Sequence, residues 1–282
     1  MNKICAGIVS YNPDTDIFLN NIKVLEKQVE LIVIVDNGSK NQLELEKVLK
    51  LQNFNILFLK NKINEGVASA LNTLCKNAIK LGFDSIFTID QDTLCPIDIV
   101  TTFMSDWNKK IGIMGPNVYY LNNDCAFSKG SGVINAEWLI TSGSLVNLEA
   151  FTKVGGFDEK LFIDDVDRDF GIRVKKSGFL VVKNLNVVIK HSLGDLKCKK
   201  ILGRLIYITN HRPERYYYMA RNSIYLDWKL NIKNSKRFIR KLRFKVMFFE
   251  KNKKEKMKWI KKGIDDAKKM IKGQCVEGPL EQ

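Results

Sequence analysis

Residues 85–92 read SIFTIDQD, an apolar, β-rich run that ends in two aspartates. Similar runs are ICAGIV (4–9), LIVIV (31–35), NILFL (55–59) and GIMG (112–115). Their apolar residues are continuous rather than alternating, as a parallel sheet buried on both faces requires. Helical patterns lie between them, near residues 14–29, 40–51 and 66–81. This alternation predicts an α/β fold with a mostly parallel sheet flanked by helices.

The composition is that of a folded protein. The chain has 282 residues, of which 45% are hydrophobic and 27% charged, enough to build a real core. No run reaches the roughly 18 apolar residues of a membrane-spanning helix, and MNKICAGIVSYN reads as a first strand rather than a signal peptide. The six cysteines are scattered, without metal or disulfide spacing, which favours a reducing cytoplasm.

The net charge of +15 is concentrated near the C-terminus. Residues 229–272 hold 18 Lys and Arg against 4 Asp and Glu, so the rest is close to neutral. Here Phe238, Leu242, Val246 and Phe249 recur at helical spacing among basic residues. Two interpretations stay open: the helix lies on an anionic membrane, or it packs its apolar stripe on the main domain.

Polar residues follow four of the apolar runs. They are Ser10, Tyr11 and Asn12; Asp36 to Ser39; Asn61 to Gly66; and Asp90, Gln91 and Asp92. Any one group is explained by turn chemistry, but ligands of such sheets bind beyond the carboxyl ends of the strands. The two carboxylates of DQD suit Mg²⁺ or Mn²⁺, and the loop at Asn64–Gly66 enters a helix whose N–H groups suit an anion.

A second acidic stretch is LFIDDVDRDFGIR (161–173), with aspartates at 164, 165, 167 and 169. Asp169 and Arg173 are four residues apart on a predicted helix and are expected to pair. Asp167 has no equally placed cation, and a positioned general base contributes about 10² to 10⁴ in rate. The alternative is an acidic helix start favoured by the helix dipole.

These stretches belong to an ordered series of blocks. The series is VSYN (9–12), DNGS (36–39), NEGVASALN (64–72), DQD (90–92), ITSGSL (140–145), GGFDE with the acidic stretch (155–173), HSLGD (191–195) and RPERYYYMARN (212–222). Over about residues 3–225 the chain resembles family 2 glycosyltransferases of the GT-A fold, and among them the bacterial rhamnosyltransferases. The resemblance implies a Rossmann-like GT-A domain (1–225), with a nucleotide-sugar half (1–125) and an acceptor half (126–225), before a basic amphipathic helical extension (226–282).

The resemblance also implies residue roles. Those for the nucleotide and its phosphates are Ser10, Tyr11, Asn12, Asp36, Asn64, Gly66, Asp90, Arg212 and Arg215. Asp92 and His191 would hold the divalent metal, and Asp167 would be the general base. Val166 stands where many relatives have glutamate, so Asp164 and Asp165 remain substitutes for the base. Thr141, Ser142, Gly143, Tyr216 and Tyr217 would contact the acceptor or the donor sugar.

The implied function is inverting, metal-dependent transfer of L-rhamnose from dTDP-L-rhamnose to a hydroxyl of a lipid-linked glycan in bacterial surface polysaccharide synthesis. The enzyme would be cytoplasmic and peripherally bound to the inner face of the cell membrane. Two alternatives remain: a transferase of UDP-hexose or UDP-galactofuranose, and a sugar-nucleotide-binding protein without catalysis. A nucleic-acid partner is not expected, because the excess charge is confined to the tail and no recognition motif is present. The sequence leaves the oligomeric state open.

Overall fold

The structure is a computed structural model that describes residues 2–52, 54–120, 128–191, 197–201 and 204–280, without the side chains of 120, 190–191, 197–201 and 204–207. The described chain forms two compact units. The first holds residues up to 120, 128–160 and 166–191, and the second holds 161–165 and the residues from 197 onward. The chain therefore leaves the first unit after Lys160 and re-enters it at Val166. The predicted division into two ligand-binding halves stays a prediction.

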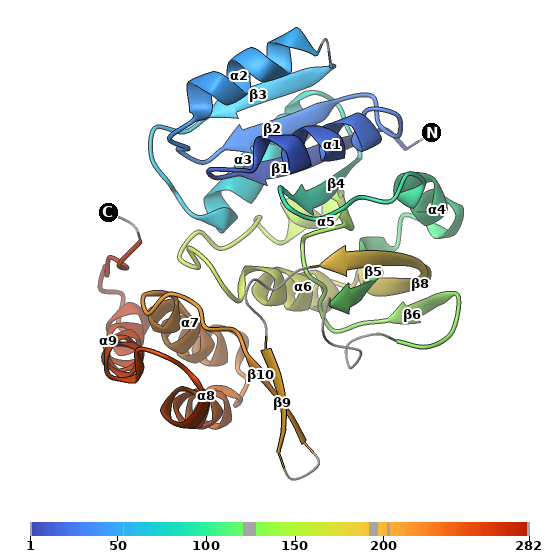
Figure 1. The fold of residues 1–282 in the computed structure, drawn as a ribbon. Coiled ribbons are helices and arrows are strands. Elements are labelled where there is room, and N and C mark those ends of the chain that lie inside the picture. The colour runs from blue at the N-terminus through green and yellow to red at the C-terminus, as the bar shows by residue number, and fades with distance from the viewer. Residues whose placement is uncertain (1, 53, 121–127, 192–196, 202–203, 281–282) are drawn as a thin grey trace. The chain divides into compact units, whose positions relative to one another are not determined.

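The first unit is built on an eight-stranded sheet (Figure 1). Its strands are β1 (Ile4–Ser10), β2 (Ile32–Asp36), β3 (Ile56–Lys60), β4 (Ser85–Asp90), β5 (Ile111–Tyr120), β6 (Val133–Asn135), β7 (Ser144–Asn147) and β8 (Leu180–His191). The order is β3-β2-β1-β4-β7-β5-β8-β6. The strands β3, β2, β1 and β4 run parallel, as their continuous apolar runs predicted. The predicted α/β fold is confirmed.

Helices cover this sheet. They are α1 (Thr15–Leu25), α2 (Gln42–Leu51), α3 (Val67–Lys80), α4 (Ile99–Asp106), α5 (Leu148–Lys153) and α6 (Val166–Lys176). Side chains of α1, α2 and α4 share one core cluster with alternate residues of β1, such as Ile8. On the other face α3 packs closely, since a Cβ at Gly7 would lie 2.7 Å from Ile86 and 3.2 Å from Leu74.

Two strands of the described sheet depart from the parallel pattern, β6, which pairs antiparallel with β8, and β7 in the middle of the sheet. The strand β7 lies between β4 and β5 and pairs antiparallel with both. Its four residues, SLVN, are all buried, but so short a run does not predict a strand from the sequence. Because β7 follows Thr141–Gly143 directly, its position fixes that turn beside the end of β4: the Gly143 N–H donates to the Thr88 carbonyl at 2.7 Å.

The second unit contains a hairpin, β9 (Lys197–Ile201) with β10 (Arg204–Ile208), and three helices, α7 (Arg215–Leu230), α8 (Ser235–Phe249) and α9 (Lys253–Ile271). Its core joins Tyr216 and Ala220 of α7, Leu242 and Val246 of α8, and Ile260 of α9. A Cβ at Gly263 of α9 would lie 2.3 Å from the Tyr217 carbonyl oxygen, so α7 and α9 approach closely at a residue without a side chain.

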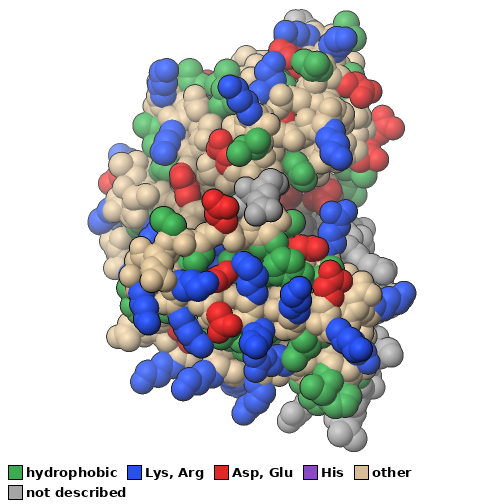
Figure 2. Space-filling model, turned by 90° about the vertical axis from the view of Figure 1, so that its left-hand side faces the viewer, with side chains coloured by type: hydrophobic (Ala, Val, Ile, Leu, Met, Phe, Trp, Pro, Cys, Tyr) green, Lys and Arg blue, Asp and Glu red, His purple; other side chains and the backbone are tan. Residues whose placement is uncertain are grey.

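The predicted apolar stripe of the basic segment divides in two. Leu242 and Val246 are buried against α7 and α9, so for them the packing interpretation is correct, with a partner inside the second unit. Phe238 is 38% exposed. Figure 2 shows Lys and Arg side chains gathered over the surface of the C-terminal helices. No helix among the described residues is both long enough and apolar enough to cross a bilayer.

Candidate active site

The sheet register brings the predicted strand ends to one edge. Ser10 pairs with Asp36, Val9 with Asp90, and Asp36 with Lys60. Four parallel strands therefore end at the same level, and the polar residues that follow them become neighbours. This is the edge where ligands bind in α/β sheets.

Asp36 is the centre of a hydrogen-bonded network at this edge. Its buried carboxylate accepts from Ser10 Oγ at 3.0 Å and from the Ser39 N–H and Oγ at 2.9 and 2.6 Å. Gln42 Nε2 donates to the same group at 2.6 Å. Asn12, in left-handed backbone (φ 47°), donates its N–H to Ser39 Oγ at 2.7 Å. These bonds fix the VSYN and DNGS loops to each other, and they leave the Tyr11 side chain 45% exposed.

Asn37 connects the next loop. Its side-chain amide donates to Asn64 Oδ1 at 2.9 Å and to the Gly66 carbonyl at 3.2 Å, and its oxygen accepts from the Glu65 N–H at 3.1 Å. Gly66 has φ 86° and precedes α3 without a side-chain cap bond to the first turn. The predicted Asn64 and Gly66 thus lie beside the DNGS loop, at the start of a helix.

Gln91, the central residue of DQD, ties that motif to the first loop. Its Oε1 accepts from the Tyr11 N–H at 2.7 Å, and its Nε2 donates to the Tyr11 carbonyl at 3.2 Å. This reciprocal pair fixes the backbone between the two aspartates. This role of Gln91 could not be predicted from the sequence, because a spacer residue between two acids carries no local signal of its partner.

The two acids of DQD have different surroundings. Asp90 is half-buried, and its pKa is raised to about 6, first by burial and then by the neighbouring charge of Asp92. The Asp90 N–H donates to Ser142 Oγ at 3.0 Å, and Ser142 donates onward to Thr93 Oγ1 at 2.8 Å. Asp92 is exposed. The predicted Ser142 therefore supports the motif from within the first unit.

Asp167 reaches the same turn from α6. Its Oδ2 lies 3.4 Å from the Thr141 backbone nitrogen, one residue before Ser142. Asp167 stands in the first turn of α6, where the helix dipole favours a carboxylate over the neutral acid. Val166 is only 2% exposed, so this departure from the family pattern fills the interior rather than leaving a gap.

The predicted Asp169–Arg173 pair is confirmed. Asp169 is fully buried and accepts from Arg173 Nε at 2.8 Å. Arg173 also donates to the carbonyls of Val154 and Gly156, each at 2.8 Å. The pair fastens the glycine turn after α5 to α6.

The two substitute acids belong to the second unit. Asp164 and Asp165 have φ values of 65° and 62°, two consecutive left-handed residues. Arg215 donates from Nη2 to Asp164 Oδ1 at 2.9 Å and from Nε to Oδ2 at 3.1 Å. Asn222 Nδ2 donates to the Ile163 and Asp164 carbonyls at 2.8 and 2.9 Å. The segment is thereby attached to α7, and Arg215 holds a carboxylate.

Tyr216 and Tyr217 have a different place from the one predicted. Both are fully buried, with their hydroxyls donating to Glu250 and Asp266 respectively. Arg221 is also buried, its guanidinium 5.4 and 4.9 Å from the ring centres of Tyr217 and Tyr218. Rings packed inside the helical core offer no face to a sugar, so the sequence prediction of sugar contacts is corrected to a packing role. The predicted Arg212 is exposed.

The predicted metal ligands are Asp92 and His191. His191 ends β8, but its side chain lies outside the described part. Among the described side chains, three or more His, Cys, Asp or Glu are nowhere grouped for a metal. Asp90 and Asp92 nevertheless fit a divalent cation that takes few protein ligands and keeps water and phosphate oxygens. Burial raises the pKa of Asp90 most and the charge of Asp92 raises it further, and a bound cation would offset that mutual repulsion of the two carboxylates.

Comparisons with known proteins agree with this architecture. The sequence profile described as glycosyl transferase family 2 matches residues 6–157. The chain is 31% identical over 244 residues to the dTDP-rhamnosyl transferase RfbF of Shigella flexneri, covering 80% of each chain.

Two solved structures share the fold. The mannosyltransferase PcManGT of Pyrobaculum calidifontis, in complex with GDP-Man and Mn²⁺, superposes with a TM-score of 0.59 at 14% identity, over 79% of this chain and 62% of that one. TarS 1-349 of S. aureus, in complex with UDP-GlcNAc, has a TM-score of 0.55 at 13% identity, over 98% and 93%. These two structures show the fold, and the profile match and the identity to RfbF show the family: the chain belongs to glycosyl transferase family 2.

Proposed function

We propose that the protein transfers L-rhamnose from dTDP-L-rhamnose to a hydroxyl of a lipid-linked glycan, with inversion at the anomeric carbon. The observation that carries the catalytic part is the approach of Asp167 to the Thr141–Ser142 turn, whose serine hydroxyl in turn contacts the backbone of Asp90. One turn thus joins a helix-borne carboxylate to the DQD motif. The identity to a dTDP-rhamnosyl transferase supports the choice of donor.

The nucleotide would lie along the strand ends of the first unit. The network around Asp36 holds Ser10 and Asn12 in place, and Tyr11 offers an exposed aromatic ring. Asn64 and Gly66 stand at the start of α3, where backbone N–H groups suit an anion. We assign the base and ribose to this surface, with the phosphates towards Asp90 and Asp92.

Asp92 would hold a divalent cation, with Asp90 beside it and His191 as a further proposed ligand. When bound, such an ion stabilises the negative charge of a departing nucleoside diphosphate. The exposed position of Asp92 leaves room for phosphate oxygens and water. Gln91, through its two bonds to Tyr11, holds the backbone that presents both carboxylates.

Asp167 would act as the general base. Its carboxylate takes the proton from the acceptor hydroxyl while that oxygen forms a bond to the anomeric carbon. The bond from the anomeric carbon to the phosphate oxygen breaks, and its electron pair leaves with the diphosphate. Asp167 lies in the first turn of α6, where the helix dipole favours negative charge. A single displacement of this kind inverts the configuration.

A donor panel tests the proposal. Purified protein is incubated with Mn²⁺ and dTDP-rhamnose, UDP-galactose, UDP-galactofuranose, UDP-glucose or UDP-N-acetylglucosamine, and thermal protection and nucleotide release are measured. Protection and release with dTDP-rhamnose alone are expected. Response to a UDP-sugar would overturn the rhamnose assignment while keeping the reaction class. Protection without release or transfer for any donor would favour a binding protein.

The acceptor and the cellular site are the remaining parts of the proposal. We place the enzyme at the cytoplasmic face of the cell membrane, where a polyprenyl-linked glycan would present its terminal hydroxyl. The support is the basic character of residues 229–272, since each basic residue near an anionic surface contributes about 1 kcal/mol. Transfer of radiolabelled rhamnose to an extractable lipid-linked product is the measurement that decides.

A further inference from the structure

The outward face of α8 is an exposed apolar patch. The helix buries Ile239, Leu242 and Val246 against α7 and α9. On the other side, Phe244, Met247 and Phe248 are 52%, 52% and 57% exposed. The rings of Phe244 and Phe248 contact each other, with centres 4.7 Å apart. Neighbouring apolar side chains left in water on one helix face indicate an interaction surface.

Basic side chains surround this patch. Lys236, Arg237, Arg240, Lys241 and Arg243 are all exposed, and the sequence of α8 contains no Asp or Glu. Helical spacing places Arg237, Arg240 and Lys241 on the same side as Phe244, because they precede it by seven, four and three residues. The outward face therefore has a basic N-terminal half and an apolar C-terminal half.

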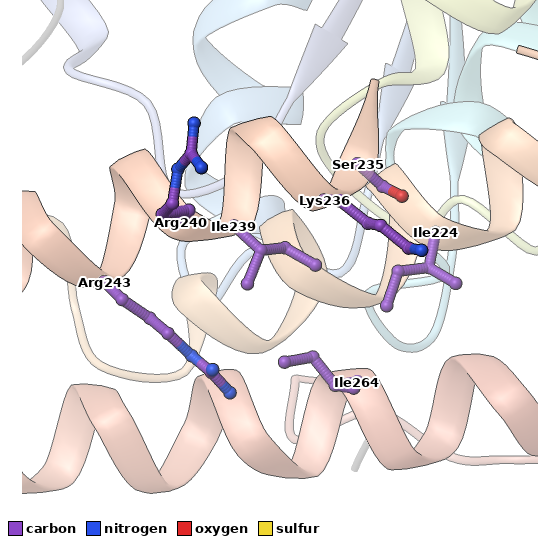
Figure 3. A pocket seen from close by; sticks show the side chains of 7 residues that line it. All are labelled: Ile224, Ser235, Lys236, Ile239, Arg240, Arg243 and Ile264. Atoms are coloured by element: carbon purple, nitrogen blue, oxygen red, sulfur yellow. The ribbon is translucent and has the colours of Figure 1, made fainter. Parts of the chain in front are cut away.

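The same chemistry continues in a groove beside this face. The groove, of about 460 Å³, is formed by α7, α8 and α9. Figure 3 shows the side chains that line it. Ile224, Ile239 and Ile264 contribute apolar surface, and Lys236, Arg240 and Arg243 contribute positive charge. A molecule with an anionic head and an apolar body matches both parts.

We propose that this face of α8 docks on an anionic lipid surface, with Phe244, Met247 and Phe248 inserted between the acyl chains and the flanking Arg and Lys at the lipid phosphates. An interfacial helix is expected to combine an apolar insertion with basic residues in this way. The inference deepens the proposed function and rests on it for the membrane-bound acceptor. It also replaces the Phe238–Leu242–Val246–Phe249 stripe of the sequence analysis, since Leu242 and Val246 are used in the core.

Two other occupants fit less well. A second copy of the chain, docked through the same face, would bring two sets of basic residues together without acidic partners on either α8. A nucleic acid would use the charge, but Met247 offers it no stacking ring, and Phe244 and Phe248 already contact one another. A bilayer accommodates both the charge and the unpaired apolar atoms.

Vesicle sedimentation with the full chain tests the proposal, using vesicles of phosphatidylcholine alone and of phosphatidylcholine with phosphatidylglycerol. The apolar variant is Phe244→Ser with Phe248→Ser, and its control is Leu43→Ser with Leu51→Ser, two exposed leucines of α2. The charge variant replaces Arg237, Arg240 and Lys241 by Gln. Its control makes the same change at Lys253, Lys254 and Lys258, which are exposed on α9.

Binding to anionic vesicles only, lost at least tenfold in both α8 variants and kept in both controls, is the expected result. Equal loss in the α9 control would overturn the assignment, because it would show general charge attraction. The assignment would also be overturned if the apolar variant bound vesicles as tightly as the parental protein. A parental dimer seen by sedimentation equilibrium and lost in the apolar variant would overturn it too, as would tighter binding of the parental protein to an oligonucleotide than to vesicles. Donor-dependent nucleotide release, measured without vesicles, tests the proposed function separately and is expected to be unchanged in all four variants.

Discussion

Arg215 holds Asp164 by two nitrogen donors, and in doing so it fixes a segment that ends two residues before the proposed base. The pair is partly exposed, with side-chain accessibilities of 36% and 19%, so its contribution to stability is limited to about 1 kcal/mol. Its value lies in geometry, since Asp164 and Asp165 both have strained, left-handed backbone.

We therefore expect Arg215→Lys, which keeps the charge but loses the two-nitrogen contact, to lower kcat roughly tenfold or more while the KM for donor stays close to its parental value. Steady-state kinetics measure this split, and the thermal midpoint should move little. Arg237→Lys, at an exposed arginine of α8 outside the proposed active site, is the control. A large fall in stability with normal kcat would assign the pair to folding alone.

Asp167→Asn tests the base directly. The change keeps the size and the contact to the Thr141 nitrogen but removes the proton acceptor, so kcat should fall by about 10² to 10⁴ with donor binding retained. Single-turnover transfer and donor protection measure the two effects. Asp165→Asn should keep most of the activity, whereas Asp164→Asn breaks the same contact as Arg215→Lys and should lower kcat by a similar factor of roughly ten. Abolished transfer in either of these variants, with normal transfer in Asp167→Asn, would move the base to the preceding segment.

Asp92→Ala tests the cation. Asp92 is exposed at the end of DQD, and its removal should abolish the Mn²⁺-dependent part of the thermal shift given by dTDP. The thermal midpoint of the protein without ligand should be unaffected. Asp98→Ala is the matched control, because Asp98 is also exposed and makes no side-chain cap bond to α4. An unchanged Mn²⁺ response in Asp92→Ala would remove this residue from the cation site.

Gly263→Ala tests the contact between α7 and α9. Alanine improves helix propensity by about 1 kcal/mol, yet its Cβ would lie 2.3 Å from the Tyr217 carbonyl oxygen. Overpacking against backbone costs about 1 to 3 kcal/mol, so we expect net destabilisation. Denaturant unfolding measures it, with Lys258→Ala, at an exposed position of α9, as the control. A rise in stability would mean that α9 shifts freely.

His211 should make stability depend on pH. Burial, and then the charge of Arg215, lowers its pKa from 6.5 to about 4. Lys245 lowers it further, while Asp164 and Glu250 act in the opposite direction. The unfolded chain therefore takes up a proton below pH 6.5 that the folded chain does not, and stability falls as pH drops from about 6.5 to about 4. In His211→Gln the thermal midpoint should change less with pH over that window, and above the window its pH dependence should match that of the parental protein. An unchanged slope would place the titration elsewhere.

The sequence predicted the first unit well because its signals are local. Continuous apolar runs located β1 to β5, and the end of each run located the site residues. The contacts made by Gln91 and Asn37 were not predictable, since each depends on which strands become neighbours. The buried tyrosines of α7 were misread for the same reason: an aromatic residue beside arginine looks alike in a core and in a sugar site. Only the packing of α8 and α9 on α7 separates the two.

The left-handed backbone at Asp164 and Asp165 also limits how this chain can vary. Glycine tolerates that conformation because it has no Cβ, and asparagine and aspartate because their short polar side chains hydrogen-bond locally, whereas β-branched residues and glutamate have no such compensation for the clash of the Cβ with the backbone. The backbone conformation therefore limits which residue types can stand at positions 164 and 165, whatever their role in catalysis. A sequence library randomised at both positions and selected only for soluble folding should return mainly Asp, Asn and Gly, so an acid retained at these two positions is no guide by itself to catalysis.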